Sequence, residues 1–148
     1  MDPLSLQNLL SHFDNEIDTI NKNWMVIDEN HVVKDLSEIS TDENILLIGL
    51  MPNYGTDAEN SDNVLDKSFS QFLILEKTDY SELNRQQFLD IFQRTFLVAK
   101  EIKDRLIEYS ADKQCEFPYL MQLDINSLKM EPIYKLAQCN GWALEFDL

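Results

Sequence analysis

The chain has 148 residues, of which 44% are hydrophobic and 26% charged, which is typical of one globular domain, and its 3 Gly and 4 Pro exclude collagenous and low-complexity classes. Twelve Lys and Arg against 27 Asp and Glu leave a formal net charge of −15. So acidic a surface repels phosphate groups, which argues against tight nucleic-acid binding and against docking on an anionic membrane. No apolar run approaches the roughly 18 residues that a membrane-spanning helix needs, and the first residues lack a secretion-signal pattern, so a cytoplasmic origin is expected.

The chain is expected to begin with an amphipathic helix. Asp2 can cap this helix, and Pro3 suits its first turn. Apolar residues then recur at three- and four-residue steps, which is the helical period. They are Leu6, Leu9, Leu10, Phe13, Ile17 and Ile20. Two short strands around a polar turn are predicted next, at residues 24–28 and 31–33. Residues 45–51 are apolar throughout, which predicts a strand buried on both faces.

Residues 52–67 differ in character from the segments on either side. They are rich in Asn, Asp, Ser and Gly, which favour turns and loops. We therefore predict a long acidic loop at about 52–67 that joins two paired strands and is mobile in the isolated protein. The next strand is predicted at residues 69–76, where β-branched and aromatic residues return.

A long helix is predicted at residues 81–110, with Asp79 and Glu82 forming a capping box. Its apolar stripe is Phe88, Leu89, Phe92, Phe96, Ala99, Ile102 and Leu106. The remainder is predicted to be β-structure, with strands at 119–125, 128–136 and 142–148. Pro132 is expected to mark a sheet edge or a bulge, and the dipeptide Asn140-Gly141 is expected to form the turn before the last strand.

These elements predict one α+β domain spanning residues 1–148. Its mainly antiparallel sheet would pack against one long central helix and a shorter N-terminal helix. The apolar faces of the last strand and the long helix match, so we expect them to form the core. The strand residues Trp142, Leu144 and Phe146 would pack against the helix residues Phe92, Phe96 and Ile102.

Residues that could carry catalysis are scarce. His12 and His31 have no companion at metal-ligand spacing. We therefore predict that His12 lies on a helix surface and His31 at a strand end. Cys115 and Cys139 match no zinc spacing, so two semi-buried thiols in a reducing compartment are expected. Phosphate-binding and nucleophile-elbow motifs are missing from the sequence. We therefore predict no catalytic, cofactor or metal site and no enzymatic activity.

Two features point to binding instead. Trp24 is either a core residue or an aromatic anchor for a partner. The acidic residues of the 52–67 segment would face solvent and could meet a partner. The predicted interface residues are therefore Trp24, Asp57, Glu59, Asp62 and Asp66.

The closing residues carry a resemblance to a known family. They read Met130-Glu131-Pro132-Ile133 and then Asn140-Gly141-Trp142-Ala143-Leu144-Glu145-Phe146. With the order of elements, this stretch resembles the tail-terminator and tail-completion proteins of long-tailed bacteriophages. The resemblance implies a virion protein, assembled in the host cytoplasm, whose copies form a six-fold ring that contacts tail-tube or neck proteins. Such a ring would let DNA pass without tight binding, and acidic walls suit that task.

Two other classes remain open. An intracellular adaptor or inhibitor would present its acidic surface to one basic partner, and would be a monomer or a dimer. A small enzyme would assemble its site from residues scattered along the chain, in a pocket with perturbed titratable groups. A ring subunit is distinguished from both by forming homo-oligomers.

Overall fold

The computed structural model describes residues 1–60, 63–81 and 83–148, which form three α-helices, two 3-10 helices and a five-stranded sheet. The helical elements are α1 (Pro3–Glu16), α2 (Glu29–Glu38), η1 (Thr41–Glu43), α3 (Arg85–Ala111) and η2 (Pro118–Gln122). The strands are β1 (Lys22–Val26), β2 (Leu46–Asn60), β3 (Asn63–Lys77), β4 (Asp124–Leu136) and β5 (Cys139–Asp147). Their order across the sheet is β1-β2-β3-β5-β4, and only the β1–β2 pairing is parallel in the described strands. The predicted α+β class, with a long central helix and a shorter N-terminal one, is confirmed.

Helix α1 forms where the capping and stripe signals predict it. The Asp2 carboxylate accepts hydrogen bonds from the backbone N–H groups of Leu4 and Ser5, both at 3.0 Å. These groups have no partner within the helix, so the cap stabilises its first turn. The helix lies directly on the sheet at Gly49, where an added Cβ would come within 2.6 Å of Leu10 Cδ1. A side chain at Gly49 would therefore force the Leu10 side chain to move.

Helix α3 starts later than predicted. Asn84 accepts from the backbone N–H of Gln87 at 2.9 Å, and Gln87 accepts in return from the Asn84 N–H at 2.9 Å. This pair is the capping box, whereas Asp79 closes a local turn by accepting from Ser81 N–H at 3.0 Å. Glu82, the partner expected for Asp79, lies outside the described residues. In the part of the chain that the structure describes, no helix is long and apolar enough to cross a bilayer.

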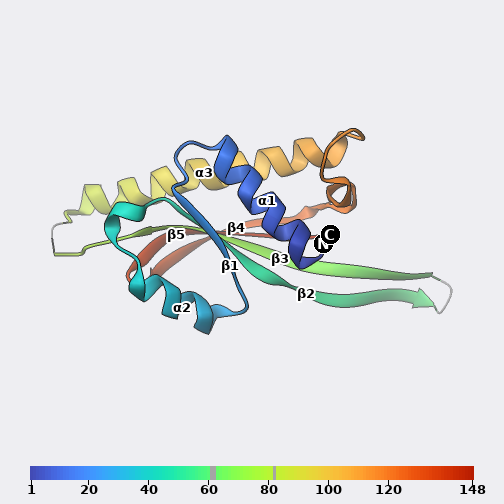
Figure 1. Ribbon diagram of the computed structural model, residues 1–148, viewed down its shortest axis with the longest axis horizontal. Coiled ribbons are helices and arrows are strands. Elements are labelled where there is room, and N and C mark those ends of the chain that lie inside the picture. Colours follow the sequence, from blue (N-terminus) through green and yellow to red (C-terminus); the bar gives the residue numbers. More distant parts are fainter. Residues whose placement is uncertain (61–62, 82) are drawn as a thin grey trace.

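Helices lie on both faces of the sheet (Figure 1), and an apolar cluster lies on each face. Helices α1 and α3 cover one face, and the buried side chains below them include Phe13, Phe72, Leu144, Phe146 and Ile102. Helix α2 covers part of the other face, with a smaller core of Val26, Val32, Leu36, Ile39, Leu46, Ile48, Leu73, Leu75, Cys139 and Ala143. The predicted packing of the last strand on the long helix is confirmed. Trp142 is half-buried, and its ring centroid lies 6.4 Å from that of Phe92 and 5.3 Å from that of Phe96.

Two of the predicted strands are helices. Residues 31–33 belong to α2, which begins where Asp28 accepts from His31 N–H at 2.9 Å. The prediction was wrong because two apolar residues in succession look extended, whereas the spacing of Val32, Leu36 and Ile39 is helical. Much of the predicted strand at 119–125 is η2. There the buried Leu120 and Leu123 are three residues apart, as a 3-10 turn requires, although the local sequence also alternates.

The predicted turn at Asn140-Gly141 is also wrong. Both residues lie within β5, and the turn is formed by Ala137 and Gln138, whose φ angles are 47° and 64°. Gly141 serves a close approach of strands instead, because an added Cβ would lie 2.0 Å from the backbone oxygen of Ile74. Asn-Gly is a turn signal only where both positions need positive φ, and in this chain non-glycine residues carry those angles.

The predicted loop at 52–67 is largely a continuation of two strands. Strand β2 runs on to Asn60 and β3 begins at Asn63, while residues 61–62 lie outside the described residues. The prediction failed because loops and solvated strands share a polar composition. Here antiparallel pairing supplies the backbone hydrogen bonds, so no apolar alternation is needed to form the ribbon. A register shift between Leu50 and Asn53 places Pro52 at an irregularity, where a missing N–H is tolerated.

Candidate functional site

The longest projecting feature is the outer part of the β2–β3 hairpin, residues 55–60 and 63–67, called the arm below. Strand β1 pairs with β2 only as far as Leu50, and β5 pairs with β3 only from Phe69. Ser68 still exchanges backbone hydrogen bonds with Leu148, at 2.8 and 2.9 Å. Beyond that point β2 and β3 pair only with each other among the described residues. At about 3.3 Å per residue, the arm extends roughly 20 Å, and Figure 1 shows it projecting from one end of the body.

The lateral edges of the sheet are less open to pairing than the arm. At one edge, β1 has only five residues. At the other, β4 contains Pro132, so the prediction of an edge position for Pro132 is confirmed. Lys129 and Glu131 form an ion pair of 2.5 Å on the same strand. A short strand at one edge, and proline with charged residues at the other, are the usual means of preventing unwanted strand addition.

The predicted interface residues do not form one site. Trp24 lies on β1 opposite Ile48, where its Nε1 donates to Asp35 Oδ2 at 3.1 Å across to α2. It is half-buried in the smaller core. Asp57 and Glu59 lie on β2 in the arm and Asp66 lies on β3, whereas Asp62 falls outside the described residues. Nine residues separate the Trp24 level of β2 from Asp57, or roughly 30 Å along the strand.

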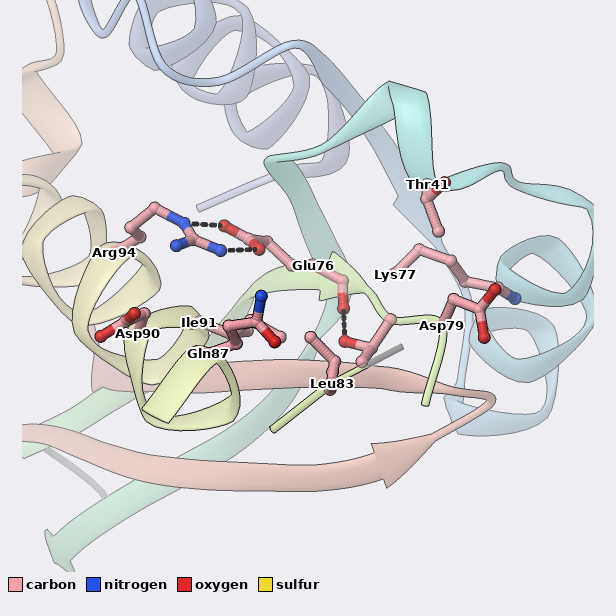
Figure 2. A pocket seen from close by; sticks show the side chains of 10 residues that line it. Thr41, Glu76, Lys77, Asp79, Leu83, Gln87, Asp90, Ile91 and Arg94 are labelled. Carbon is pink, nitrogen blue, oxygen red and sulfur yellow. Dashed lines mark hydrogen bonds and ion pairs between the residues drawn. The ribbon is translucent and has the colours of Figure 1, made fainter. Parts of the chain in front are cut away.

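A polar hollow of about 430 Å³ opens at the other end of β3 (Figure 2). Its walls come from the end of β3, the start of α3 and η1. Within it Arg94 donates from Nε and Nη2 to the two carboxylate oxygens of Glu76, both at 2.9 Å. Glu76 is buried at 9% side-chain exposure, while Arg94 keeps 54% of its side chain exposed. The hydrogen bonds that Arg94 donates to the Glu76 carboxylate raise the pKa of Arg94.

This ion pair is better suited to holding α3 on the sheet than to catalysis. Both carboxylate oxygens of Glu76 accept hydrogen bonds from the Arg94 guanidinium. Glu76 could act on a substrate only through an oxygen that already accepts from Arg94. Asp90 and Asp79 also line the hollow. The described contacts place neither carboxylate in a catalytic set with both a nucleophile and a base. A buried charge that is paired and hydrogen-bonded avoids the penalty of an unpaired one.

A second polar network adjoins this hollow. The side chain of Asn140, fully buried in β5, donates from Nδ2 to Thr78 Oγ1 at 3.1 Å and to the Tyr80 hydroxyl at 2.6 Å. Its Oδ1 accepts from the backbone N–H of Lys135 at 3.0 Å. Lys77 donates from Nζ to the carbonyls of Leu36 and Ala137, at 2.6 and 3.1 Å. These bonds hold the end of β3, the β4–β5 turn and α2 together.

His12 is less exposed than a helix-surface position predicts. Its Nε2 lies 2.8 Å from the Tyr109 hydroxyl and its Nδ1 lies 3.3 Å from Glu116 Oε1. The imidazole also packs edge-on against the ring of Phe117, with centroids 4.9 Å apart. The contacts join α1 to α3 and to the segment before η2. His31, by contrast, caps locally by accepting from Ile27 N–H and lies 3.5 Å from Asp35.

Metal and thiol chemistry find little support in the described geometry. Within residues 1–60, 63–81 and 83–148, no three His, Cys, Asp or Glu side chains converge on a metal position. Cys115 and Cys139 are free thiols, the first half-buried and the second fully buried. Burial raises the pKa of the Cys139 thiol to about 11, so little of it is thiolate near neutral pH.

Sequence reasoning missed the pairing of Glu76 with Arg94 and the role of Asn140. The first pair is 18 residues apart and on different elements, so no helical or strand period connects its members. Asn140 contacts Tyr80 across 60 residues. The local signal for Asn140 is that a polar residue occupies a buried position of the strand, and this can be recognised only once the buried face of β5 is known.

Comparison with known proteins returns no relative. No protein-family model matches the chain, and neither a curated protein nor a solved structure matches it.

Proposed function

We propose that this chain is an assembly subunit that forms a homo-oligomeric ring, of the kind found in phage tail-terminator and tail-completion proteins. The observation that carries the proposal is the arm. It extends a regular two-stranded ribbon away from the body, and neither of the apolar clusters includes a residue of it among the described side chains. Two-stranded ribbons are marginal alone in water. A neighbouring subunit would bury the arm and stabilise it.

The charge distribution supports a directional assembly. Residues 1–84 contain 17 Asp and Glu and 4 Lys and Arg, which gives −13, whereas residues 85–148 contain 10 and 8, which gives −2. The two sets add to the chain total of −15. The acidic share of the chain includes the arm, and the nearly balanced share includes α3 and β4. Contacts between unlike surfaces of identical copies are head-to-tail, and they close into a ring when the rotation completes a circle.

An acidic ring also suits the passage of DNA. Each basic contact with phosphate adds salt-dependent binding, whereas acidic walls repel the backbone. In this proposal the protein is part of the virion, is assembled in the host cytoplasm and contacts tail-tube or neck proteins. Six-fold symmetry follows from the family resemblance, and no residue of the chain specifies it.

The first experiment measures the mass of the full chain in solution and images it by negative stain. We expect concentration-dependent oligomers and ring-shaped particles. The test variant lacks residues 55–67, with Tyr54 joined to Ser68 through an Asn-Gly turn that suits a two-residue hairpin. Because the two cores stay intact, its thermal unfolding should lie within a few degrees of the native chain, and its oligomers should be lost.

A charge-matched pair separates the arm from total charge. Both variants neutralise four exposed or arm acids, so they raise the net charge equally. The arm set is Asp57→Asn, Glu59→Gln, Asp62→Asn and Asp66→Asn. The control set is Asp18→Asn, Glu38→Gln, Asp42→Asn and Glu108→Gln. Assembly should respond to the arm set and not to the control. A strictly monomeric native chain, absent from purified particles, would refute the ring and favour an adaptor with one basic partner.

A further inference from the structure

The end of the molecule opposite the arm carries a compact group of aromatic and cationic side chains. Strand β3 leads from the arm to this end, where α3 begins and the β4–β5 turn lies (Figure 1). We call the group Tyr80, Phe88, Tyr134 and Lys135 the turn-end surface, and Arg85 lies at the start of α3, three residues before Phe88. Lys135 and Arg85 are exposed, and Tyr134 is 62% exposed. Large exposed aromatics beside cations are typical of binding surfaces, in which aromatic and Arg residues are enriched.

Lys135 is placed between two tyrosines. Its Nζ lies 5.3 Å from the ring centroid of Tyr80 and 5.1 Å from that of Tyr134. Both distances fall within the range of cation–π attraction. The Phe88 ring meets Tyr134 edge-on at 6.0 Å, which connects the tyrosines to the start of α3. Lys135 is therefore held by rings, and its exposed ammonium can still meet a carboxylate.

The backbone that presents Lys135 is unusual. Lys135, Ala137 and Gln138 have φ angles of 58°, 47° and 64°, the left-handed region that non-glycine residues seldom adopt. Such conformations cost free energy and persist where surrounding contacts enforce them, often at functional positions. Here the enforcing group is Asn140, which accepts from Lys135 N–H at 3.0 Å and donates to Tyr80 at 2.6 Å. One buried side chain thus fixes both the lysine and a ring beneath it.

We propose that the turn-end surface receives the acidic arm of a second copy of this chain. The inference rests on the proposed ring function and specifies its contact. Residues 55–67 contain four carboxylates and one lysine, and Lys135 and Arg85 are of opposite sign. Three acids also lie at this end, namely Asp79, Asp90 and Glu76, of which Glu76 is paired with Arg94. Lys135 packs against aromatic rings and not against a carboxylate, so we take it as the main cation that meets the arm. The arm and the turn-end surface lie at opposite ends of one molecule, which is the geometry of a head-to-tail contact.

Addition of the arm to an open strand edge explains these features less well. The outer edge of β4 contains Pro132 and the Lys129–Glu131 pair, and β1 is short. Neither edge would account for the fixed Lys135 or for the exposed Tyr134. A contact through side chains at the β4–β5 turn uses both.

The test compares Lys135→Glu with Lys113→Glu in the full chain. Both lysines are exposed, and both changes shift the net charge by −2. Lys113 follows the last residue of α3, and this end of α3 lies on the same side of the body as the arm (Figure 1). By sedimentation velocity near 0.15 M salt, Lys135→Glu should weaken self-association at least tenfold, and Lys113→Glu less than threefold. Adding Asp66→Lys to Lys135→Glu should restore part of the loss, since the exposed arm carboxylate is reversed as well. Equal behaviour of the two glutamate variants would overturn the assignment.

Cross-linking reports the contact itself. In a Cys115→Ser background, Asp66→Cys with Tyr134→Cys in one chain should give a ladder of disulfide-linked dimers, trimers and larger species. Asp66→Cys with Lys113→Cys should not. A ladder from the second pair alone would place the arm elsewhere. If the native chain self-associates but Lys135→Glu and the first pair show no effect, this inference fails and the ring stands; a native chain without self-association removes both.

Discussion

Strands β2 and β3 pass through two environments, and the contrast shows what each part of the molecule requires. In the body, Leu46, Ile48 and Leu75 are fully buried under α2, and Leu47, Phe72 and Ile74 are fully buried under α1 and α3. In the arm, the described residues of the same two strands form strand pairing only with each other. The body is stabilised by apolar burial on both faces, whereas the arm has a backbone ladder and none of its described side chains belongs to either apolar cluster.

The difference separates folding from function. A body with two apolar layers can fold whether or not the arm is present, since burial of about 25 cal/mol per Å² of apolar surface dominates folding. The arm gains little from the body and is free to differ in composition. Its acidic side chains would be costly in a core but suit an assembly contact. Changes in the body should therefore affect stability, and changes in the arm should affect association.

The largest contrast is expected between two phenylalanines of β3. Phe72 is fully buried and meets the ring of Phe146 at 5.1 Å, whereas Phe69, three residues earlier, is 40% exposed. Phe72→Ala should lower the free energy of unfolding by about 3–5 kcal/mol, because it removes apolar contacts and leaves a cavity. Phe69→Ala should cost about 1 kcal/mol or less. Urea unfolding followed by circular dichroism measures both, and similar midpoints would contradict the two-layer body.

Glycines give the next contrast. Alanine at Gly141 would place a Cβ 2.0 Å from the Ile74 backbone oxygen, which only a shift of the strands can relieve. We expect Gly141→Ala to destabilise by about 2–4 kcal/mol. Gly55, in the arm, has no atom within 4 Å of an added Cβ. Gly55→Ala should therefore change the free energy of unfolding by about 0.5 kcal/mol at most, and calorimetric midpoints would show it.

A third contrast concerns ion pairs on α3. Arg94→Met would leave the buried Glu76 carboxylate without its partner, whereas Lys100→Met breaks a pair with Asp104 whose side chains are both about half exposed. After allowance for the exposure of Arg94, we expect a loss of about 1–3 kcal/mol for the first and about 0.5 kcal/mol or less for the second. High salt should reduce the first loss less than the second. Equal effects would indicate that the Glu76 pair is as solvated as the surface pair.

Sequence reasoning recovers the elements whose signal is local. The cap at Asp2, the stripe of α1 and the apolar β2 segment each carry their pattern within a few residues. The arm was missed because a solvated ribbon and a loop have the same composition, and only long-range pairing separates them. The 3-10 turn at η2 and the strand around 119–125 share an alternating sequence, so burial of Leu120 and Leu123 was needed to choose.

The candidate sites were harder to predict for the same reason. Acidic residues of the arm stand out in the sequence, and so does Trp24. The turn-end surface does not, because Tyr80 comes from the β3–α3 connection, Phe88 from α3 and Lys135 from β4, and the fold brings them together. The turn itself was assigned to Asn140-Gly141, since no propensity predicts left-handed backbone at Lys135, Ala137 and Gln138. Tertiary contacts of Asn140 override local preference there.

The smallest expected effect uses thiols as probes of the two regions. Cys139 is fully buried and burial raises its pKa to about 11, so both access and thiolate fraction are low. A cysteine introduced as Gly55→Cys would be exposed in the arm. At pH 8 iodoacetamide should alkylate it at least about tenfold faster than Cys139, read by mass spectrometry in a Cys115→Ser background.

The raised pKa of Cys139 also sets the direction in which the free energy of unfolding changes with pH. The unfolded thiol ionises first, above about pH 9, so the stability present below that pH is lost as pH rises towards 11. In urea titrations at pH 7.5 and 10, the native chain should lose about 1 kcal/mol relative to Cys139→Ala. Alkylation of Cys139 at the rate of the arm cysteine would mean that the α2 layer opens readily and that the body is no better protected than the arm.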